Sequence, residues 1–224
     1  HLGLADGSLA GAVFTSGQTM RAALHIIGKS PRYDLISSFF IMLYCAPHDQ
    51  ISGPLVFSDC ALNVDPCAQE LTQIAIASAD SAAQLLGVEP KVAMLSFSTF
   101  GSANHPLVQR VRDATRGAKE LRPELIVEGE IQLDAALVPK VHRQKAANSR
   151  LEGKANVLVF PNLMAGNIGY KIAQRLGGAL AIGPIMQGLA KPANDLSRGC
   201  SAEDVFHMIA TTVVQAQNPA IGKE

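Results

Sequence analysis

The sequence contains no tryptophan, and aromatic residues make up only 5% of its 224 residues. Apolar residues still account for 48% of the chain, so its core must be built mainly from alanine, leucine, isoleucine and valine. The length is greater than that of one average domain and less than that of two. We therefore expect a globular chain with a large aliphatic core.

The chain also lacks net charge, because 19 Lys and Arg residues balance 19 Asp and Glu residues. This balance gives no reason to expect nucleic acid or an anionic membrane as a partner, although a local basic site for a small anion is compatible with it. The longest apolar run, LISSFFIMLYCAP at 35–47, is too short to span a membrane and lacks the basic flank of a signal peptide. We predict that this run is a buried strand and that the protein is cytoplasmic.

Metal and nucleotide motifs are missing as well. The four cysteines (Cys45, Cys60, Cys67 and Cys200) form no C-x-x-C pair, and no histidine stands beside them at metal-ligand spacing. We expect four reduced thiols, no metal site and no tightly bound cofactor. Neither G-x-x-x-x-G-K-[ST] nor G-x-G-x-x-G occurs, which argues against nucleoside triphosphates and dinucleotides.

Short apolar runs alternate along the chain with segments of helical periodicity. Strands are expected at 9–15, 35–43, 53–60, 91–98, 124–131, 155–161 and 179–188, and helices at 17–28, 65–87, about 107–120, 166–178 and from 201 onwards. Asp65 is the expected N-cap of the second helix, and Gly87 its end. The alternation predicts an α/β fold with a mostly parallel sheet, to which 35–43 and 53–60 could add an antiparallel hairpin.

In such sheets ligands bind at the carboxyl ends of strands, close to helix N-termini. The loop at 96–106 has small residues, including Ser102, that allow backbone N–H groups to approach an anion. The loop at 160–171 places Asn162, Asn167 and Lys171 at a helix start. Taken singly, an ordinary turn explains the first loop and helix capping with a surface lysine explains the second.

The third loop, at 191–200, precedes the last helix. Ser201 and Asp204 form an S-x-x-D capping box, which explains Asp204 structurally, and Asn194 with Asp195 reads as a turn. A helical face is expected to be buried through Val205, Met208, Ile209, Thr212 and Val213. Arg198 is harder to explain structurally, because a guanidinium beside a positive helix N-terminus favours an anion there.

The stretch GPIMQGLAKPANDLSRGCSAEDV at 183–205 resembles the C-terminal signature of phosphate acetyltransferases (phosphotransacetylases). The resemblance extends to PKVAMLSFSTFGSA, VEGEIQLDAAL, KANVLVFPNLMAGNIGYKIAQR and ADGSLAGAVFTSGQTMRAAL. Nearly the whole chain is thereby similar to the later two thirds of that family. The terminal motif is long and specific, whereas the shorter segments carry weight only together.

The resemblance implies a reaction in which acetyl-CoA and inorganic phosphate exchange with acetyl phosphate and CoA, by direct attack within a ternary complex. Asp204 resembles the base that takes the CoA thiol proton, Ser197 the hydroxyl that stabilises charge on the carbonyl, and Arg198 a phosphate-orienting residue. A carboxylate is a weak base for a thiol, so this role requires a partly desolvated site. The residues to which we assign substrate binding are Arg21, Asn194, Ser102, Asn167 and Lys171.

The implied fold is a three-layer α/β/α, two-domain architecture like that of isocitrate and isopropylmalate dehydrogenases, with domain I truncated. Residues 1–33 would be a remnant of domain I, 34–188 domain II, and 189–224 the C-terminal part of domain I. The resemblance also implies a homodimer formed through domain II. Because a further third usually precedes these segments, we expect exposed apolar surface on the first strand and last helix, and little activity from this chain alone.

Two alternatives stay open. A phosphate butyryltransferase would use the same chemistry on a longer acyl chain. A non-catalytic acyl-CoA-sensing module, as found at the C-terminus of some malic enzymes, would be expected to have a degraded catalytic loop. Ser197, Arg198 and Asp204 are all present, which favours the enzyme.

Overall fold

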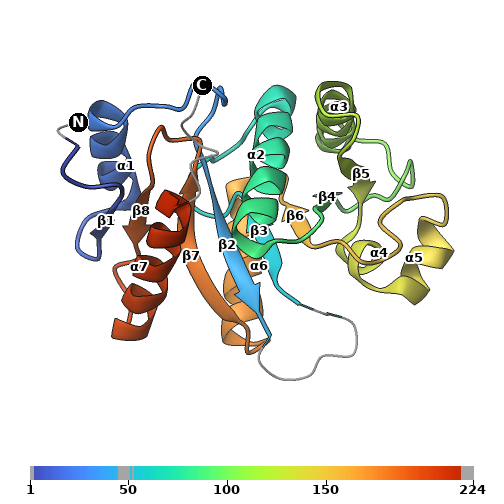
Figure 1. Cartoon of the computed structure of the whole chain (residues 1–224). Helices are drawn as coiled ribbons and strands as arrows, with labels where there is room; N and C mark the ends of the chain where they lie inside the picture. Colours follow the sequence, from blue (N-terminus) through green and yellow to red (C-terminus); the bar gives the residue numbers. More distant parts are fainter. Residues whose placement is uncertain (1–2, 45–50, 52, 218–224) are drawn as a thin grey trace.

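A six-stranded sheet forms the centre of the protein in the computed structural model, which describes residues 3–44, 51 and 53–217 (Figure 1). The strand order is β5–β4–β6–β3–β2–β7. The bounds are Ser37–Leu43 for β2, Leu55–Ser58 for β3, Lys91–Leu95 for β4, Ile126–Ile131 for β5, Val157–Val159 for β6 and Leu180–Gln187 for β7. Strand β2 is antiparallel to both its neighbours, which confirms the predicted hairpin, and the other pairs are parallel.

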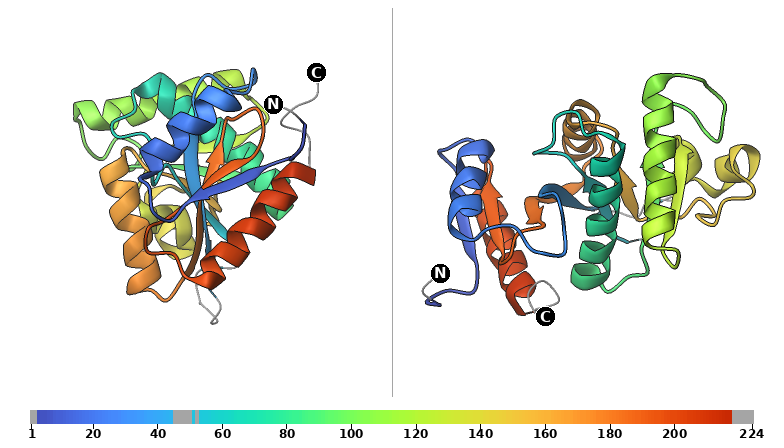
Figure 2. Two further views of the ribbon diagram at one scale, coloured as in Figure 1. Left: turned by 90° about the vertical axis from the view of Figure 1, so that its left-hand side faces the viewer. Right: turned by 90° about the horizontal axis from the view of Figure 1, so that it is seen from above.

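Helices cover both faces of this sheet (Figure 2). One face carries α2 (Ala68–Leu86), α3 (Pro106–Leu121) and α7 (Ala202–Gln217), and the other α4 (Leu133–Leu137), α5 (Pro139–Lys145) and α6 (Leu163–Arg175). Each face has its own buried aliphatic cluster. The predicted three-layer α/β/α fold is confirmed.

A second, two-stranded parallel sheet pairs β1 (Ser8–Gly11) with β8 (Ala193–Leu196). Helix α1 (Ser16–Ile26) covers one of its faces through Met20 and Ala23, and α7 packs against the other (Figure 2, left). The prediction of a turn at Asn194 and Asp195 was wrong, because both are buried strand residues. Strand β8 of this small sheet therefore leads, through a short turn, to the start of α7.

The local signals for helix ends had mixed success. Gly87 ends α2 with a φ of +64°, as predicted. Asp65 is not the N-cap of α2, because the helix starts two residues later than expected with Cys67 as its cap. The Cys67 backbone N–H donates to Glu70 Oε2 at 2.7 Å, and Asp65 instead pairs with Arg110 on α3.

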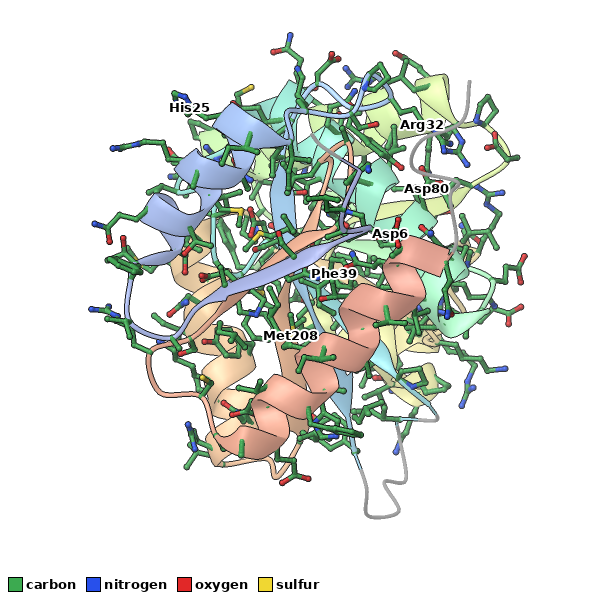
Figure 3. The ribbon with its side chains drawn as sticks, turned by 60° about the vertical axis from the view of Figure 1, so that its left-hand side comes forward. Asp6, His25, Arg32, Phe39, Asp80 and Met208 are labelled. Carbon is green, nitrogen blue, oxygen red and sulfur yellow. The ribbon has the colours of Figure 1, made fainter. Side chains whose placement is uncertain are left out.

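Helix α7 buries a narrower face than expected. Met208, in the same cluster as Phe39 on β2, and Thr212 are buried, as predicted (Figure 3). Ile209 and Val213 are instead about half exposed, at 51% and 48%. Their exposure agrees with the expectation that this helix presents apolar surface.

Cys60 and Cys200 are free thiols, the first buried and the second half-buried, while Cys45 lies outside the described residues. Among residues 3–44, 51 and 53–217, no three His, Cys, Asp or Glu side chains gather as metal ligands. In the same ranges, no helix has both the length and the apolar character needed to cross a membrane.

Candidate active site

The predicted Ser197–Arg198 pair lies on a tight turn between β8 and α7. The Gly199 N–H donates to Ser197 Oγ at 3.3 Å, and the Cys200 N–H donates to the Ser197 carbonyl at 3.1 Å. The capping box follows at once: Ser201 N–H donates to Asp204 Oδ2 at 2.8 Å, and Asp204 N–H donates to Ser201 Oγ at 3.1 Å. The turn therefore leads into a well-capped, positive helix N-terminus.

A close backbone approach fixes a second wall beside this turn. The Ala12 N–H donates to the Leu196 carbonyl at 2.9 Å. Gly11 has a φ of +112°, and a Cβ there would lie 2.6 Å from the same carbonyl oxygen. Glycine is thus required for β1 to run so close to β8. The chain that follows β1, with Thr15 and Ser16 at the start of α1, lines the same cavity as the Ser197 turn.

Helix α6 forms the third wall. Asn162 caps it by accepting from the Ala165 N–H at 2.9 Å, and Asn167 Nδ2 donates to the Cys60 carbonyl at 3.0 Å. A Cβ on Gly166 would lie 2.3 Å from the Asp59 carbonyl oxygen, so α6 packs directly on the backbone after β3.

The buried carboxylate of Asp59 organises that backbone. Its oxygens accept from the N–H groups of Ala61, Leu62 and Asn63 at 2.9–3.2 Å and from the hydroxyl of Ser38. A carboxylate that satisfies three successive backbone donors fixes the loop in one conformation. The loop then presents Ala61 to the space between α6 and the Ser197 turn.

Substituting Gly166 with alanine is expected to lower the free energy of unfolding by about 1–3 kcal/mol, because the added methyl overlaps backbone that cannot move. An exposed mid-helix Gly→Ala change normally stabilises a helix by roughly 0.5–1 kcal/mol. The matched control is Gly17→Ala in α1, where an added Cβ meets nothing within 4 Å. Urea denaturation measures both; equal stability of the two variants would contradict the close approach.

These three walls enclose a cleft of about 220 Å³. It brings together four of the predicted site residues, Ser197, Arg198, Asn167 and Lys171. The other lining residues are Phe14, Thr15, Ser16, Phe40, Ala61, Tyr170, Pro184 and Leu196. Two cationic side chains and the N-terminus of α1 thus meet at one small cleft.

Four other predicted residues do not line the cleft. Asn194 is 1% exposed, and its amide is fully engaged: Nδ2 donates to Thr212 and Gln215 of α7, and Oδ1 accepts from the Met186 N–H. Ser102 accepts from the Thr99 N–H at 3.0 Å within the loop after β4. Both side chains hold local structure, and their substrate contacts stay predictions.

Arg21 and Asp204 also lie outside the set of cleft residues. Arg21 is exposed on α1, the helix whose first residue, Ser16, borders the cleft. Asp204 is half-buried and follows Arg198 in the chain, after the tight turn and the helix cap. Its Oδ2 accepts the Ser201 N–H of the capping box. The predicted cap is therefore confirmed, while the predicted catalytic role is not tested by this geometry.

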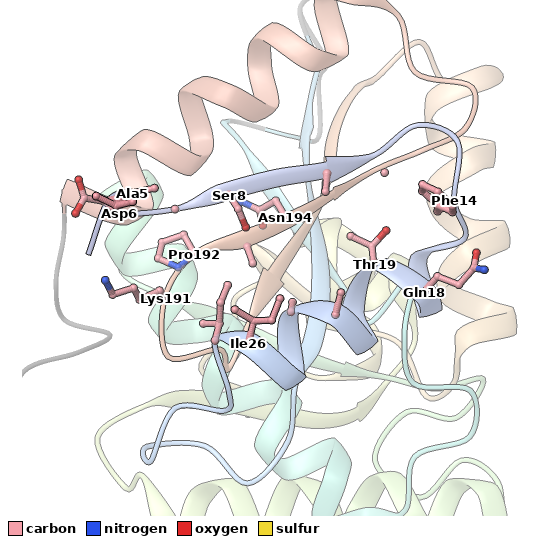
Figure 4. A pocket seen from close by; sticks show the side chains of 18 residues that line it. Ala5, Asp6, Ser8, Phe14, Gln18, Thr19, Ile26, Lys191, Pro192 and Asn194 are labelled. Atoms are coloured by element: carbon pink, nitrogen blue, oxygen red, sulfur yellow. The ribbon is translucent and has the colours of Figure 1, made fainter. Parts of the chain in front are cut away.

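The described part of the chain also contains a larger hollow. About 770 Å³ opens between α1 and the β1–β8 sheet, lined mainly by apolar groups such as Phe14, Ala22 and Ile26, with Asp6 and Lys191 at its rim (Figure 4). Ser8, Gln18, Thr19 and the predicted residue Asn194 also line it, but the Asn194 amide is engaged within the fold, and Ser197, Arg198 and Asp204 do not border this hollow. The smaller cleft is the better candidate site, because the reactive side chains converge there.

Residues 1–213 match the protein family described as "Phosphate acetyl/butaryl transferase". The chain belongs to this family. The match spans β8, the Ser197 turn and most of α7, so the cleft is formed by residues within the family region. The resemblance first noted at 183–205 is thereby confirmed.

Individual relatives and solved structures that match this chain belong to the same family. The chain is 53% identical over 217 residues to a phosphate acetyltransferase of Paracoccus denitrificans, covering 97% of this chain and 68% of the relative. It is 54% identical over 215 residues to one of Thermoanaerobacterium thermosaccharolyticum, covering 96% and 66%. A phosphotransacetylase structure from Streptococcus pyogenes matches with a TM-score of 0.88 and 50% identity, covering 96% of this chain and 64% of that one. The chain thus spans about two thirds of the length of these family members.

Several cleft residues of this family member were missed by sequence reasoning. Tyr170 had a detectable signal, since Asn167, Tyr170 and Lys171 lie at i, i+3 and i+4 on one face of a helix. Phe40 gave none, because it stands inside a continuous apolar strand that reads only as core.

Proposed function

We propose that this chain carries the acyl-transfer site of a phosphate acetyltransferase, exchanging an acetyl group between CoA and inorganic phosphate. The observation that carries the proposal is the convergence of Ser197, Arg198 and Lys171 on one cleft, beside the start of α1. The family membership and the names of the relatives support the same reaction. CoA, acetyl phosphate and phosphate are then the partners.

The size and charge of the cleft suit an acyl phosphate. Its volume of about 220 Å³ is below the roughly 300–1,000 Å³ of pockets for drug-sized ligands, so CoA must remain mostly outside. Arg198 can bind phosphate oxygens in a bidentate manner, with Lys171 as a second positive charge. The Ser197 hydroxyl can donate to the carbonyl oxygen as negative charge develops on it.

The reaction we infer is direct. The CoA sulfur attacks the carbonyl carbon of acetyl phosphate, and Asp204 accepts the thiol proton. The bond between that carbon and the phosphate oxygen breaks, and phosphate leaves with the electron pair. Asp204 does not line the cleft; it follows the lining residue Arg198 along the chain. We therefore assign the proton transfer to the mouth of the cleft, where the larger CoA thiol must arrive.

Arg198→Ala is expected to weaken the binding of inorganic phosphate by about 10–100-fold, since it removes a charge-assisted hydrogen bond. Turnover of acetyl phosphate and CoA should fall as well. Isothermal titration measures the phosphate dissociation constant, and thioester absorbance measures turnover. Arg143→Ala on α5, an exposed arginine outside the cleft, is the control and should leave both unchanged.

Three outcomes decide the proposal. Thioester formation that depends on Arg198 supports acetyl transfer. Phosphate or acyl-CoA binding without turnover in the full-length protein favours the acyl-CoA-sensing alternative. No phosphate binding by the unmodified protein contradicts the placement of the site. Comparing acetyl with butyryl phosphate tests the butyryltransferase alternative.

The division into residues 1–33 with 189–224 and residues 34–188, and the homodimer, stay predictions. Sedimentation of the protein at two concentrations would test the dimer.

A further inference from the structure

One side of the cleft is apolar and aromatic. The rings of Phe40 and Tyr170 stack with centroids 4.0 Å apart and an interplanar angle of 15°. Pro184 of β7 lies beside them in the cleft lining. We call these three residues the aromatic wall; their ring carbons offer an apolar surface that suits a short hydrocarbon.

Phe40, at the base of the aromatic wall, is tightly packed. Phe40 is 4% exposed and belongs to the buried cluster beneath α6. A Cβ on Gly183 would lie 2.6 Å from the Phe40 ring, so the ring lies flat against the backbone of β7. Tyr170 covers its other face. A side chain held on both faces cannot swing aside for a larger ligand without repacking the core.

The polar and apolar parts of the cleft orient an acyl phosphate. Arg198 and Lys171 bind the phosphate end, and Lys171 Nζ lies 5.8 Å from the centroid of the Tyr170 ring. The acyl chain, only two bonds from the phosphorus at its carbonyl carbon, must then point toward nearby apolar side chains. Among the apolar side chains that line the cleft, Phe40 is 4% exposed and fixed in the core, whereas Phe14 is 61% exposed.

We propose that the aromatic wall sets the acyl-chain length that the site accepts, with Tyr170 as its specificity-determining residue. The inference rests on the proposed function and deepens it. An acetyl group fits against the ring pair, whereas each further methylene meets a surface that does not move. Discrimination over one methylene in apolar pockets is commonly about 10–200-fold, so two extra methylenes should cost at least about tenfold.

The test compares Tyr170→Ala with the matched variant Tyr170→Phe, which keeps the ring and removes only the hydroxyl. Dissociation constants are measured by isothermal titration for inorganic phosphate, acetylphosphonate and butyrylphosphonate, the last two being analogues that cannot transfer their acyl group. We expect the unmodified protein and Tyr170→Phe to prefer acetylphosphonate by at least about tenfold. We expect Tyr170→Ala to reduce that preference at least fivefold while phosphate affinity stays within about twofold.

An unchanged acetyl-to-butyryl ratio in Tyr170→Ala, with phosphate still bound, overturns the role of the wall and leaves the proposed function standing. Failure of the unmodified protein to bind phosphate overturns both. If Tyr170→Ala loses phosphate binding through misfolding, Tyr170→Leu removes fewer contacts and is judged by the same ratio.

Discussion

Replacing Asp204 with asparagine is expected to lower turnover by about 10²–10⁴-fold, the usual contribution of a positioned general base. Asparagine has nearly the same shape and can still accept the Ser201 N–H bond that Asp204 Oδ2 accepts at 2.8 Å. The change therefore removes the proton acceptor and keeps the helix cap. CoA affinity should change little, because the proton moves only during reaction. Thioester absorbance at saturating acetyl phosphate, with the change made in the full-length protein, measures the loss.

Ser201→Ala separates capping from catalysis. It removes the hydroxyl that accepts from the Asp204 N–H at 3.1 Å but leaves the carboxylate in place. We expect a loss of about 0.5–2 kcal/mol in the free energy of unfolding, with turnover within a few-fold of normal. If the two variants lose turnover equally, Asp204 acts only as a cap. If Asp204→Asn keeps full turnover, it is not the base.

The elements that sequence analysis predicted well have local signals. Gly87 ends α2 because a left-handed residue follows the last turn, and glycine adopts that conformation without strain. The Ser201–Asp204 box is recognisable because its two hydrogen bonds span only three residues. Apolar runs likewise indicated the strands of the six-stranded sheet, because its central strands β2, β3 and β6 are buried almost throughout.

Strand β8 and the aromatic wall depend on contacts that sequence spacing does not encode. Asn194 can be buried because Thr212 and Gln215 of α7 receive its amide hydrogens. Asp195 is 1% exposed, and neither carboxylate oxygen has a hydrogen-bond partner among the described residues, which no local rule anticipates. Phe40 and Tyr170 meet only because α6 covers β2.

Replacing Glu130 with alanine should lower the free energy of unfolding at pH 7 by about 1–3 kcal/mol, because it leaves the hydrogen-bond donors around this buried carboxylate, such as the buried Ser98 hydroxyl, without their acceptor. The Glu130 side chain, on β5, is 2% exposed. Its carboxylate accepts hydrogen bonds from Nε and Nη2 of Arg112 at 2.7 and 2.9 Å. It also accepts from the Ser98 hydroxyl and the Gly101 N–H, both at 2.8 Å. One carboxylate thus ties α3, β5 and the loop after β4 together.

The matched control is Asp113→Ala, which removes an exposed pair with Arg116 on the same helix. Exposed pairs contribute about 0.2–1 kcal/mol, so the control should lose far less in urea denaturation. Equal losses would contradict a structural role for the Glu130 network.

The effect of Glu130→Ala should depend on pH. Burial alone raises the pKa of Glu130, but the Arg112 guanidinium, the Gly101 N–H and the Ser98 hydroxyl outweigh it and hold that pKa at about 2. In the unfolded chain the pKa of a glutamate is about 4.3. Because the folded value is lower, the stabilisation is complete above about pH 4.3 and is lost as the pH falls toward 2.

The difference in unfolding free energy between the unmodified protein and Glu130→Ala should therefore be constant from pH 7 to 5 and shrink between pH 4 and 2. A difference that stays the same at pH 3 would show that the carboxylate charge does not carry the network.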